Sequence, residues 1–568
     1  MTQTVDAAQA RPPELDGRVA IPAWWRAIAA EHGAREMVRR NGLQGLTYAE
    51  VDAKSAAIAR GLLAEGAGKG TRVGVLMPNG PEWIASWLAV SRIGGIVIAL
   101  STFAATRELA YAVRHADVAI LLTSDRYLRH DYCARLEEAF PGLAAHDGRE
   151  VIALEECPYL RSIWVAGDAP KWARGALSDL ETKGRASRVF SEALLMEVEA
   201  EVAPSDPCIM IYTSGSTALP KAVVHISGAV VSKAEFLATS NSLIPANTET
   251  GDRMLITAAM FWVGGLDCLI GGVIKGVCIL CVDDHSPASL LEAIRRDQAT
   301  HVSGSEAVMR AIASVDGWKP SDFDRLKVLT ASQRAYFAML RGGGTVTREQ
   351  VPDSLGMTET IGPHSGVPNN ELRPAGGEIT WGQALDRMEL KVVDPETGEP
   401  APVGEMGELL VRGPWLMEGF YKRLRRDAFD ADGWYATGDR CFFDAEGFLY
   451  FRGRLGGMIK TSGANVSPEE VEEAIRLDPD VLDVAVFPIP DPKLEQMVVA
   501  VIAPRPGCDM TEESVKARLR SELSSFKVPK RILFMDFDAL PRTPSNKIRR
   551  PALATMVAPQ LTQSETAG

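Results

Sequence analysis

A run of hydroxyl and glycine residues that ends in a lysine is the strongest chemical signal in this 568-residue sequence. Hydroxyls and free backbone N–H groups can surround phosphate oxygens, glycine lets the backbone approach them, and a lysine adds positive charge. The apolar run just before it, 208–211, predicts a strand that leads into a phosphate-binding loop. A surface turn has a similar composition, and no Gly-Lys-Ser/Thr ending of a Walker P-loop is present. The loop comprises Thr213, Ser214, Gly215, Ser216 and Thr217, with Lys221 four positions later.

Four further motifs carry charged residues that suit a nucleotide. Glu359 ends the run Leu355-Gly356-Met357-Thr358, and a carboxylate there could hold a hard cation. Asp439 follows Thr437-Gly438 and offers two acceptor oxygens, which suits the vicinal diol of a ribose. Arg454 and Lys547 could balance phosphate charge, and a cation between an attacking carboxylate and a phosphate lowers the barrier. Taken singly, the Thr358-Glu359 pair would indicate a helix cap and the Gly438-Asp439 step a turn. The segments with Arg454 and Lys547 would indicate solvated charges.

Together and in this order, the five motifs resemble those of the adenylate-forming superfamily, which includes acyl-CoA synthetases, aryl-CoA ligases, firefly luciferase and peptide-synthetase adenylation domains. The sequence is closest in type to the acyl-CoA ligases. The resemblance implies an ATP-dependent acid–CoA ligase, an AMP-forming enzyme that makes a carbon–sulfur bond. A carboxylate and ATP would give acyl-AMP and pyrophosphate, and CoA would then take the acyl group and release AMP. ATP and CoA are thus implied as co-substrates, and Mg²⁺ as the cofactor.

The resemblance also implies a role for each matching residue. Thr217 and Glu359 would hold Mg²⁺, and these two with Lys547 would form the catalytic set. Lys547 would act in adenylation and withdraw when the small domain rotates for the second half-reaction. The implied ATP and AMP contacts are Thr213, Ser214, Gly215, Ser216, Thr217, Lys221, Ser332, Gln333, Leu355, Gly356, Met357, Thr358, Asp439, Arg454 and Lys547.

Two more sets of residues concern the acid and the acyl acceptor. Trp262 stands where the family usually has a histidine, and either a gate or a core role fits an indole. Asp267 lies five residues beyond Trp262, out of register for gripping an α-amino group, so we expect an apolar, aromatic or fatty-type acid. The implied acyl pocket comprises Phe261, Trp262, Gly264, Gly265, Gly356 and Met357. The implied CoA contacts are Lys460, Ser462, Gly463 and Ala464.

Several departures from the family pattern leave rival interpretations open. Ala218 and Ala222 replace glycines, and alanine tolerates left-handed backbone angles poorly. Leu355 replaces an aromatic residue, and Gly456 replaces a charged hinge residue. One rival is a stand-alone adenylation enzyme that loads an acyl carrier protein, which would share all five motifs; the lack of a carrier-like domain after them in this chain is compatible with CoA as the acceptor. Another is a catalytically silent binding paralogue, which the retained charged residues disfavour.

The elements that must position these residues alternate between strands and helices. Segments 71–77, 95–100 and 118–123 read as buried strands, and 81–93 and 106–116 as helices, which predicts an α/β fold with mainly parallel βαβ sheets. Glycine-bounded segments 404–413 and 447–453 predict a β-rich subdomain. Beyond them the pattern predicts a small mobile α+β domain. We therefore predict a large domain over 1–453 with a flexible tail at 1–18, a hinge over 454–457, and a small domain over 458–568 with a flexible tail at 560–568.

Composition narrows the class of protein. A net charge of −13 argues against a nucleic-acid partner, which requires clustered cations. Cys278 and Cys281 lie in an apolar run, so they read as buried strand residues, and the scattered cysteines fit a cytoplasmic location. The N-terminus lacks the apolar core of a signal peptide, and charges and glycines interrupt 258–282, so we expect no transmembrane segment. The expected partners are a small carboxylic acid, ATP and CoA, and a homodimer is left open.

Overall fold

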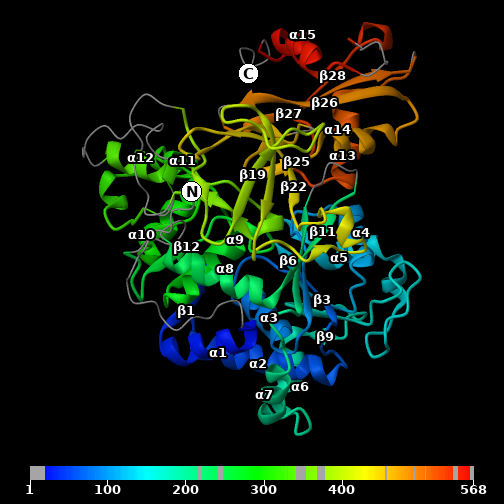
Figure 1. The fold of residues 1–568 in the computed structure, drawn as a ribbon. Coiled ribbons are helices and arrows are strands. Elements are labelled where there is room, and N and C mark those ends of the chain that lie inside the picture. The colour runs from blue at the N-terminus through cyan, green and yellow to red at the C-terminus, as the bar shows by residue number, and fades with distance from the viewer. Residues whose placement is uncertain are drawn as a thin grey trace.

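The fold was analysed on a computed structural model, which describes residues 19–213, 219–240, 247–328, 331–340, 353–367, 378–454, 457–491, 493–505, 507–541 and 548–562. Figure 1 shows a large N-terminal part with a smaller C-terminal part stacked on one end. Among the predicted site residues, Ser214, Gly215, Ser216, Thr217 and Lys547 lie outside the described residues, as does the side chain of Ser332.

An eight-stranded, mainly parallel sheet forms the centre of the large part, in the order β21-β11-β10-β4-β3-β5-β8-β9. Strands β10, β4, β3, β5, β8 and β9 pair in parallel, whereas β11 and β21 are antiparallel additions at one edge. The bounds are β3 (Arg72–Leu76), β4 (Ile96–Ala99), β5 (Ile120–Ser124), β8 (Ser162–Ala166), β9 (Gly175–Ala176), β10 (Pro207–Thr213), β11 (Lys221–Ile226) and β21 (Gly419–Phe420).

A second sheet has five strands in the order β14-β12-β13-β1-β2, parallel except for β2. One apolar core joins the two sheets: Ile279 of the second sheet and Val97 of the first belong to the same buried cluster, with Trp83 of α3 and Leu266 of α9. The bounds are β1 (Glu36–Arg40), β2 (Leu46–Thr47), β12 (Arg253–Leu255), β13 (Cys278–Cys281), β14 (His301–Val302), α1 (Ile21–His32), α2 (Tyr48–Ala64), α3 (Pro81–Arg92), α8 (Ser227–Thr239) and α9 (Val263–Ile274).

Further helices and short strands surround these sheets (Figure 1). Helix α4 begins at a capping box in which the Glu108 side chain accepts from the Ala105 N–H, and its neighbour α5 packs against it. The bounds are α4 (Thr106–His115), β6 (Arg126–Tyr127), β7 (His130–Asp131), α5 (Tyr132–Ala139), α6 (Leu177–Ala186), α7 (Glu192–Ala200), α10 (Pro287–Asp297), α11 (Glu306–Ala313) and α12 (Ala331–Leu340).

A β-rich subdomain follows, as the glycine-bounded segments predict. Its four-stranded antiparallel sheet has the order β19-β20-β22-β23, and burial alternates along β20, as expected for a sheet with one face on a core. Two small hairpins lie beside it in sequence. The bounds are β15 (Gly356–Met357), β16 (Gly362–Pro363), β17 (Ser365–Gly366), β18 (Gln383–Ala384), β19 (Glu389–Val393), β20 (Gly407–Arg412), β22 (Tyr435–Phe443) and β23 (Leu449–Arg454).

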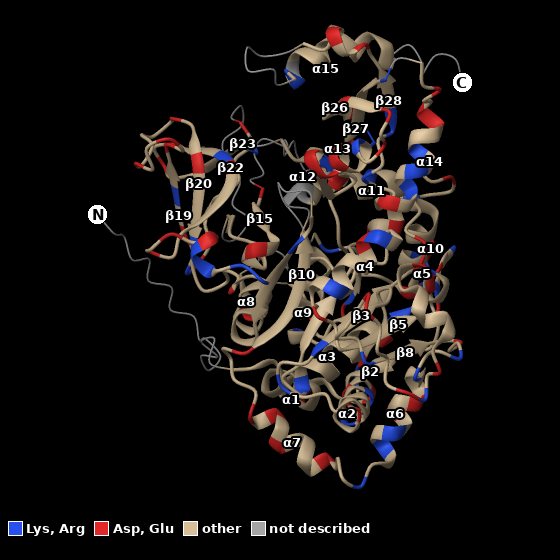
Figure 2. Ribbon diagram, turned by 90° about the vertical axis from the view of Figure 1, so that its right-hand side faces the viewer, with Lys and Arg blue, Asp and Glu red and all other residues tan. Residues whose placement is uncertain are grey.

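The C-terminal part is an α+β unit with its own core on both faces of one sheet. Its centre is a long hairpin of β26 and β27, and β28 adds in parallel to β27. Figure 2 shows this unit above α4 and α5, with α14 nearest to them. The bounds are β24 (Ile459–Thr461), β25 (Ala464–Val466), α13 (Pro468–Arg476), β26 (Val481–Asp491), β27 (Glu495–Pro504), α14 (Glu512–Glu522), β28 (Arg531–Phe534) and α15 (Arg550–Thr562).

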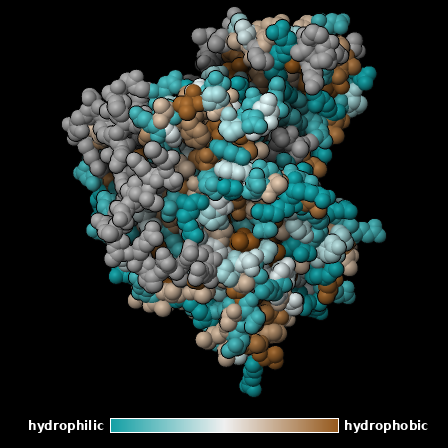
Figure 3. Space-filling view, in the orientation of Figure 1, coloured by the Kyte–Doolittle hydropathy of each residue, from teal (hydrophilic) through white to brown (hydrophobic). Residues whose placement is uncertain are grey.

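The predicted α/β fold with a small C-terminal α+β unit is confirmed, and one detail is wrong. The tail predicted to start at 560 begins inside α15, where Leu561 is buried against the sheet. The tail predicted at 1–18 lies outside the described residues. The apolar stretch 258–282 forms α9 and β13 inside the core, and no helix in the described part of the chain is long and apolar enough to cross a bilayer. The face in Figure 3 is largely hydrophilic where it is described.

Candidate active site

The predicted phosphate-binding loop connects two paired strands. Thr213 ends β10 and lies opposite Lys221, the first residue of β11, so the two ends of the loop are held side by side. Ala222 is fully buried, and its place in β11 opposite Tyr212 gives it an extended backbone rather than the left-handed one that glycine favours. The backbone strain expected for alanine at this position is therefore wrong, because an extended strand accepts alanine without strain.

The Leu355–Glu359 motif forms a tight hairpin of β15 and β16. Met357 pairs with Gly362, and a side chain at Gly356 would place its Cβ 2.5 Å from the backbone of Gly362, so only glycine fits there. The main-chain carbonyl of Glu359 accepts a hydrogen bond from the N–H of Met417, with a length of 2.8 Å. The hairpin is therefore fixed on the subdomain that carries β22 and β23.

Three predicted nucleotide-binding side chains and the predicted metal ligand Glu359 meet beside this hairpin. The guanidinium Nε of Arg454 donates to Asp439 Oδ1 at 2.7 Å, and these two residues face each other across β22 and β23. Lys221 and Arg454 both interact electrostatically with Glu359, which is 8% exposed. The structure thus brings residues from four separate motifs into one mixed-charge cluster.

Burial and neighbouring charges perturb every member of this cluster. Burial raises the pKa of the Glu359 carboxyl, against the opposing effects of Arg454 and Lys221. Burial likewise raises the pKa of Asp439, and it lowers the pKa of Lys221. A hydrogen bond from the backbone N–H of Glu359 and the charges of Arg454 and Lys221 act against the effect of burial on its carboxyl, and no described side chain donates to the Glu359 carboxylate, so it can still offer an oxygen to a cation. Perturbed carboxyls of this kind are typical of functional sites.

A second buried polar layer supports the hairpin from behind. The Lys233 ammonium donates to the carbonyl of Pro363 and lies 4.1 Å from the ring centre of Trp415. Asp267 faces Gly362, where a Cβ would lie 1.8 Å from its Oδ2. Burial lowers the pKa of Lys233 to about 7 and raises that of Asp267 to about 7. These residues therefore pack against the hairpin.

The predicted acyl-pocket residues divide between packing and open space. Phe261 is 2% exposed and belongs to the main core, whereas Trp262 is only partly buried. The Trp262 ring contacts Phe103 at 5.6 Å and Phe526 of the C-terminal part at 6.0 Å, measured between ring centres. A Cβ on Gly264 would meet only Ala258, at 4.0 Å, whereas one on Gly265 would collide with the backbone of Ala259. Trp262 thus lies where the two parts of the molecule meet.

The other two predicted acyl-pocket residues belong to the β15–β16 hairpin. Met357 is buried under the subdomain sheet, and Gly356 is exposed beside it.

Other predicted site residues lie apart from the cluster. The Gln333 amide is buried in α12 and donates to the carbonyls of Val302 and Gly304, so it ties α12 to the segment after β14. Lys460, Ser462, Gly463 and Ala464 form the β24–β25 hairpin of the C-terminal part, with an exposed turn at Ser462 and Gly463. Their roles, and those of the residues outside the described part, stay predictions.

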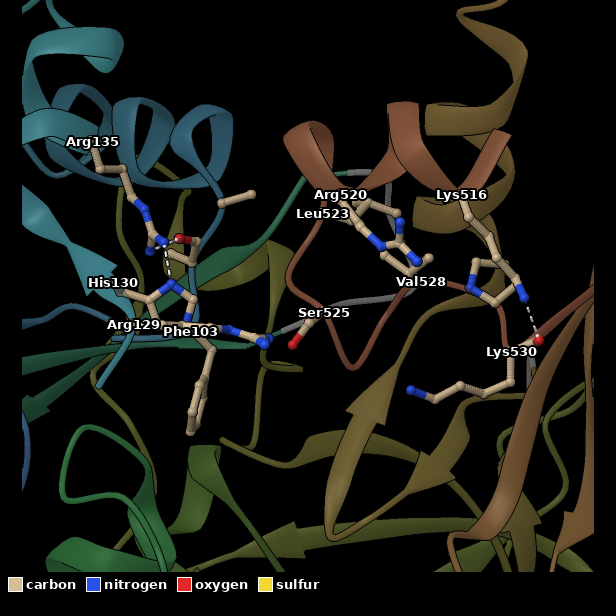
Figure 4. Close-up of a pocket in the computed structure, with 13 residues that line it drawn as sticks. Phe103, Arg129, His130, Arg135, Lys516, Arg520, Leu523, Ser525, Val528 and Lys530 are labelled. Atoms are coloured by element: carbon tan, nitrogen blue, oxygen red, sulfur yellow. Dashed lines mark hydrogen bonds between the residues drawn. The ribbon is translucent and has the colours of Figure 1, made fainter. Parts of the chain in front are cut away.

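Sequence reasoning missed a basic pocket of about 340 Å³ between the N- and C-terminal parts. The N-terminal part supplies Arg129, His130 and Arg135 to its wall, and none of the described residues that line it is acidic. The C-terminal part supplies Lys516, Arg520 and Lys530 (Figure 4). The two groups of cations are hundreds of positions apart in sequence. The sequence signal that could have indicated the pocket is the cluster of basic residues on α14.

Three of these cations are available to a ligand. Arg135 donates to the Ala104 carbonyl and to Nδ1 of His130, and Lys516 donates to the Lys530 carbonyl. In contrast, the side chains of Arg129, Arg520 and Lys530 make no ion pair or hydrogen bond with the described residues. Figure 4 shows them around a shared space, an arrangement that can bind a compact polyanion.

Comparison with known proteins agrees with the motifs and the fold. The chain is 28% identical to a feruloyl-CoA synthase from an Amycolatopsis species, over 92% of this chain and 96% of that one. It is 27% identical to an indoleacetate–CoA ligase from Aromatoleum aromaticum, over 92% and 95% of the two chains.

Solved structures show the same fold. An amide bond synthetase from Marinactinospora thermotolerans superposes with a TM-score of 0.76 at 24% identity, covering 95% of this chain and 99% of that one. An o-succinylbenzoate CoA synthetase from Bacillus subtilis gives 0.71 at 23% identity, covering 93% and 97%.

Family models cover both parts of the chain. The model of the AMP-binding enzyme matches residues 25–421, and that of the AMP-binding enzyme C-terminal domain matches residues 470–547. The predicted membership of the adenylate-forming superfamily is therefore confirmed, and the chain belongs to the AMP-binding enzyme family.

Proposed function

We propose that this enzyme is an ATP-dependent acid–CoA ligase. In the first half-reaction, a carboxylate oxygen attacks the α-phosphorus of ATP and pyrophosphate leaves. In the second, the CoA sulfur attacks the acyl carbon, AMP leaves and the thiol proton passes to solvent. The observation that carries the proposal is the buried cluster of Glu359, Asp439, Arg454 and Lys221 next to the ends of the phosphate-binding loop.

Each member of the cluster has a proposed role. Asp439 accepts from the ribose hydroxyls, and Arg454 holds Asp439 in place and reaches the phosphates. Glu359 and Thr217 would hold Mg²⁺, which neutralises phosphate charge when bound. The Glu359 carboxylate, which receives no hydrogen bond from a described side chain, fits that donor set. Lys221 and Lys547 supply positive charge to the phosphates and to the attack on the α-phosphate.

The basic pocket supports CoA as the acceptor. CoA carries a 3′-phosphate and a diphosphate, whereas a simple amine carries no anion and a carrier-bound arm carries one phosphate. Arg129, Arg520 and Lys530 offer three cations without partners among the described residues. A site of one sign favours the ligand with the most charge. We therefore favour CoA over a carrier protein and over the amine acceptor that the name of the amide bond synthetase suggests.

The proposed acid is apolar, aromatic or of the fatty type. The open position at Gly264 and the ring of Trp262 offer an apolar surface. The names of two relatives refer to ferulate and indoleacetate, which are aromatic acids.

The proposal includes two domains that move about residues 454–457 and a cytoplasmic setting. Arg454 ends β23, and Gly457 has a φ of +77°, which supports a turn there. All eight cysteines are free, as expected in a reducing compartment. A homodimer also stays a proposal, which sedimentation would test.

One experiment tests the function. Ferulate, indole-3-acetate, octanoate and benzoate are each supplied with ATP and Mg²⁺, and pyrophosphate release is measured with CoA, with dephospho-CoA or with an amine. The expected result is acid-dependent pyrophosphate, a thioester detected by mass, and a higher KM for dephospho-CoA than for CoA. An amide product, or a thioester formed only on a phosphopantetheinyl carrier, would identify a rival acceptor. Absence of pyrophosphate with every acid of a wider panel would favour the silent paralogue.

A further inference from the structure

A buried cluster of three charged side chains bridges the two parts of the molecule, outside the nucleotide site. The Lys527 ammonium donates to Glu108 Oε1 at 2.6 Å and to Glu470 Oε1 at 2.7 Å. Glu108 belongs to α4 of the large part, whereas Lys527 and Glu470 belong to the C-terminal part. The hydroxyl of Ser524 donates to the other oxygen of Glu108. Lys527 is 6% exposed and Glu470 is 5% exposed, so water screens these charges weakly.

The segment that contains Lys527 also makes further contacts between the two parts. Phe526, the preceding residue, packs edge-on against Trp262 and Phe103. Val528 and Lys530, just after it, line the basic pocket. The position of Lys527 therefore fixes both the aromatic contact and the C-terminal wall of the pocket.

The cluster can open without leaving an unpaired charge in a buried place. If the C-terminal part moves away, Lys527 keeps its bond to Glu470, which travels with it. Glu108 keeps the hydrogen bond from the Ala105 N–H at the start of α4. A buried ion pair is costly to break when one partner stays buried and unpaired; here Lys527 keeps a carboxylate partner, and Glu108 keeps a hydrogen-bond donor on the face that the C-terminal part would uncover. The contact can therefore be strong in the closed state and still open reversibly. A domain that alternates between two orientations requires both properties.

We propose that Lys527 is a positioning residue for the acyl-transfer step, because its bond to Glu108 holds the C-terminal part in the orientation that assembles the acceptor pocket. This rests on the proposed function, in which that pocket binds CoA. Under that proposal adenylation takes place in the other orientation of the C-terminal part, in which Lys547 would reach the nucleotide, so loss of the Lys527–Glu108 bond should not slow adenylation. Lys527 touches no substrate, and its effect passes through Val528 and Lys530.

The test separates the two half-reactions in the full-length enzyme. Adenylation is measured as acid-dependent exchange between ATP and pyrophosphate, with the acid that gives most release in the panel above. Acyl transfer is measured as thioester formation from the synthetic acyl-AMP of the same acid. Calorimetric titration with CoA gives a third readout that needs no acid. For Lys527→Met we expect the rate of acyl transfer to fall about tenfold or more, which is the effect of losing a hydrogen bond between charged groups. The rate of exchange between ATP and pyrophosphate should change by less than about twofold.

Variants and controls distinguish positioning from folding. Lys527→Arg should restore most of the acyl transfer. Glu108→Gln should lower it in the same way, and the Glu108→Gln/Lys527→Met double variant should lose little more, because both changes break one contact. The matched control is Glu522→Gln, which breaks the exposed ion pair with Arg107 at the same interface, and neither step should change by more than about twofold.

Three results would overturn the inference. Equal loss of both half-reactions with a lower Tm would make Lys527 a folding residue. Unchanged acyl transfer and CoA binding in Lys527→Met would remove the role altogether. Loss of acyl transfer in Lys527→Met without any loss in Glu108→Gln would confine the effect of Lys527 to the C-terminal part. Failure of the proposed function would look different, because the unmodified enzyme would then bind no CoA or release no pyrophosphate.

Discussion

The cluster around Glu359 and the basic pocket around Arg520 are both charged, but they differ in sign, burial and origin. The cluster mixes carboxylates and cations, lies largely buried, and is built from strands and a hairpin of the large part alone. The charged residues of the pocket are all cations, Arg129, Arg520 and Lys530 among them are exposed, and about half of the wall comes from the C-terminal part. Figure 2 shows that part resting on α4, and the residues just before α4 line the pocket.

This difference indicates how the two half-reactions can be separated. A site built within one domain is preorganised and stays intact when the other domain moves. A site built between two domains exists only in one of their orientations, so its ligand binds and leaves as the domains move. Changes in the cluster should therefore affect adenylation first, and changes at the interface should affect acyl transfer first.

The largest expected effect belongs to Lys547→Ala. Without that cation the attack of one anion on another loses its stabilisation, so exchange between ATP and pyrophosphate should fall about 1,000-fold. The rate of thioester formation from supplied acyl-AMP should change by less than about threefold, since the proposed orientation for acyl transfer does not use Lys547. Lys183→Ala, an exposed lysine of α6, is the control. An equal fall in both steps would contradict the alternation of domains.

Glu359→Gln should rank second, with adenylation reduced about 100-fold because the carboxylate that would hold the metal is lost. It should also raise Tm of the ligand-free enzyme at pH 8. Burial raises the pKa of Glu359, so the ionised carboxylate costs stability above that pKa and the cost disappears as the pH falls towards 4.5.

Thermal unfolding at pH 8 and at pH 5, without ATP, checks the second part of this prediction. The difference in Tm between the unmodified enzyme and Glu359→Gln should shrink at the lower pH. A variant that is less stable at both pH values would show that the carboxylate stabilises the hairpin instead.

Arg520→Ala should act on the other region. Loss of one unpartnered cation should raise KM for CoA about tenfold, as for a charged hydrogen bond to phosphate, and leave pyrophosphate exchange unchanged. The effect should weaken in high salt, because the pocket is open to solvent. Arg185→Ala on the exposed face of α6 is the control. If KM for CoA stays constant while exchange falls, the basic pocket serves ATP rather than the acceptor.

Sequence alone predicted the cluster better than the pocket, and the reason is physical. The strands before the phosphate-binding loop, the turn at Gly438 and the end of β23 are local features, so short motifs place Lys221, Asp439 and Arg454 at predictable points. The pocket joins Arg129 to Arg520, which are far apart in sequence and meet only through the packing of α14 on α4. No local pattern encodes a contact of that kind.

Local reasoning also failed where packing decided the conformation. Ala222 replaces a family glycine, which suggested strain, yet β11 gives it ordinary extended geometry. Segment 560–562 is polar enough to resemble a tail, but Leu561 extends α15 onto the sheet. In both places the deciding contact comes from another strand.

Trp262 lies between the two regions, so its variant gives the smallest and most selective expected effect. Trp262→Ala should change the ratio of kcat/KM between indole-3-acetate and octanoate by about three- to tenfold, the scale of a change in pocket contacts, with little effect on the KM for ATP. Phe261→Leu is the matched control, because the neighbouring ring is buried in the core and its loss should lower Tm without changing acid preference. If the two variants behave alike, Trp262 is a core residue. If Trp262→Ala instead lowers acyl transfer from supplied acyl-AMP while acid preference stays the same, its main partner is Phe526, and the ring belongs to the interface between the domains rather than to the acyl pocket.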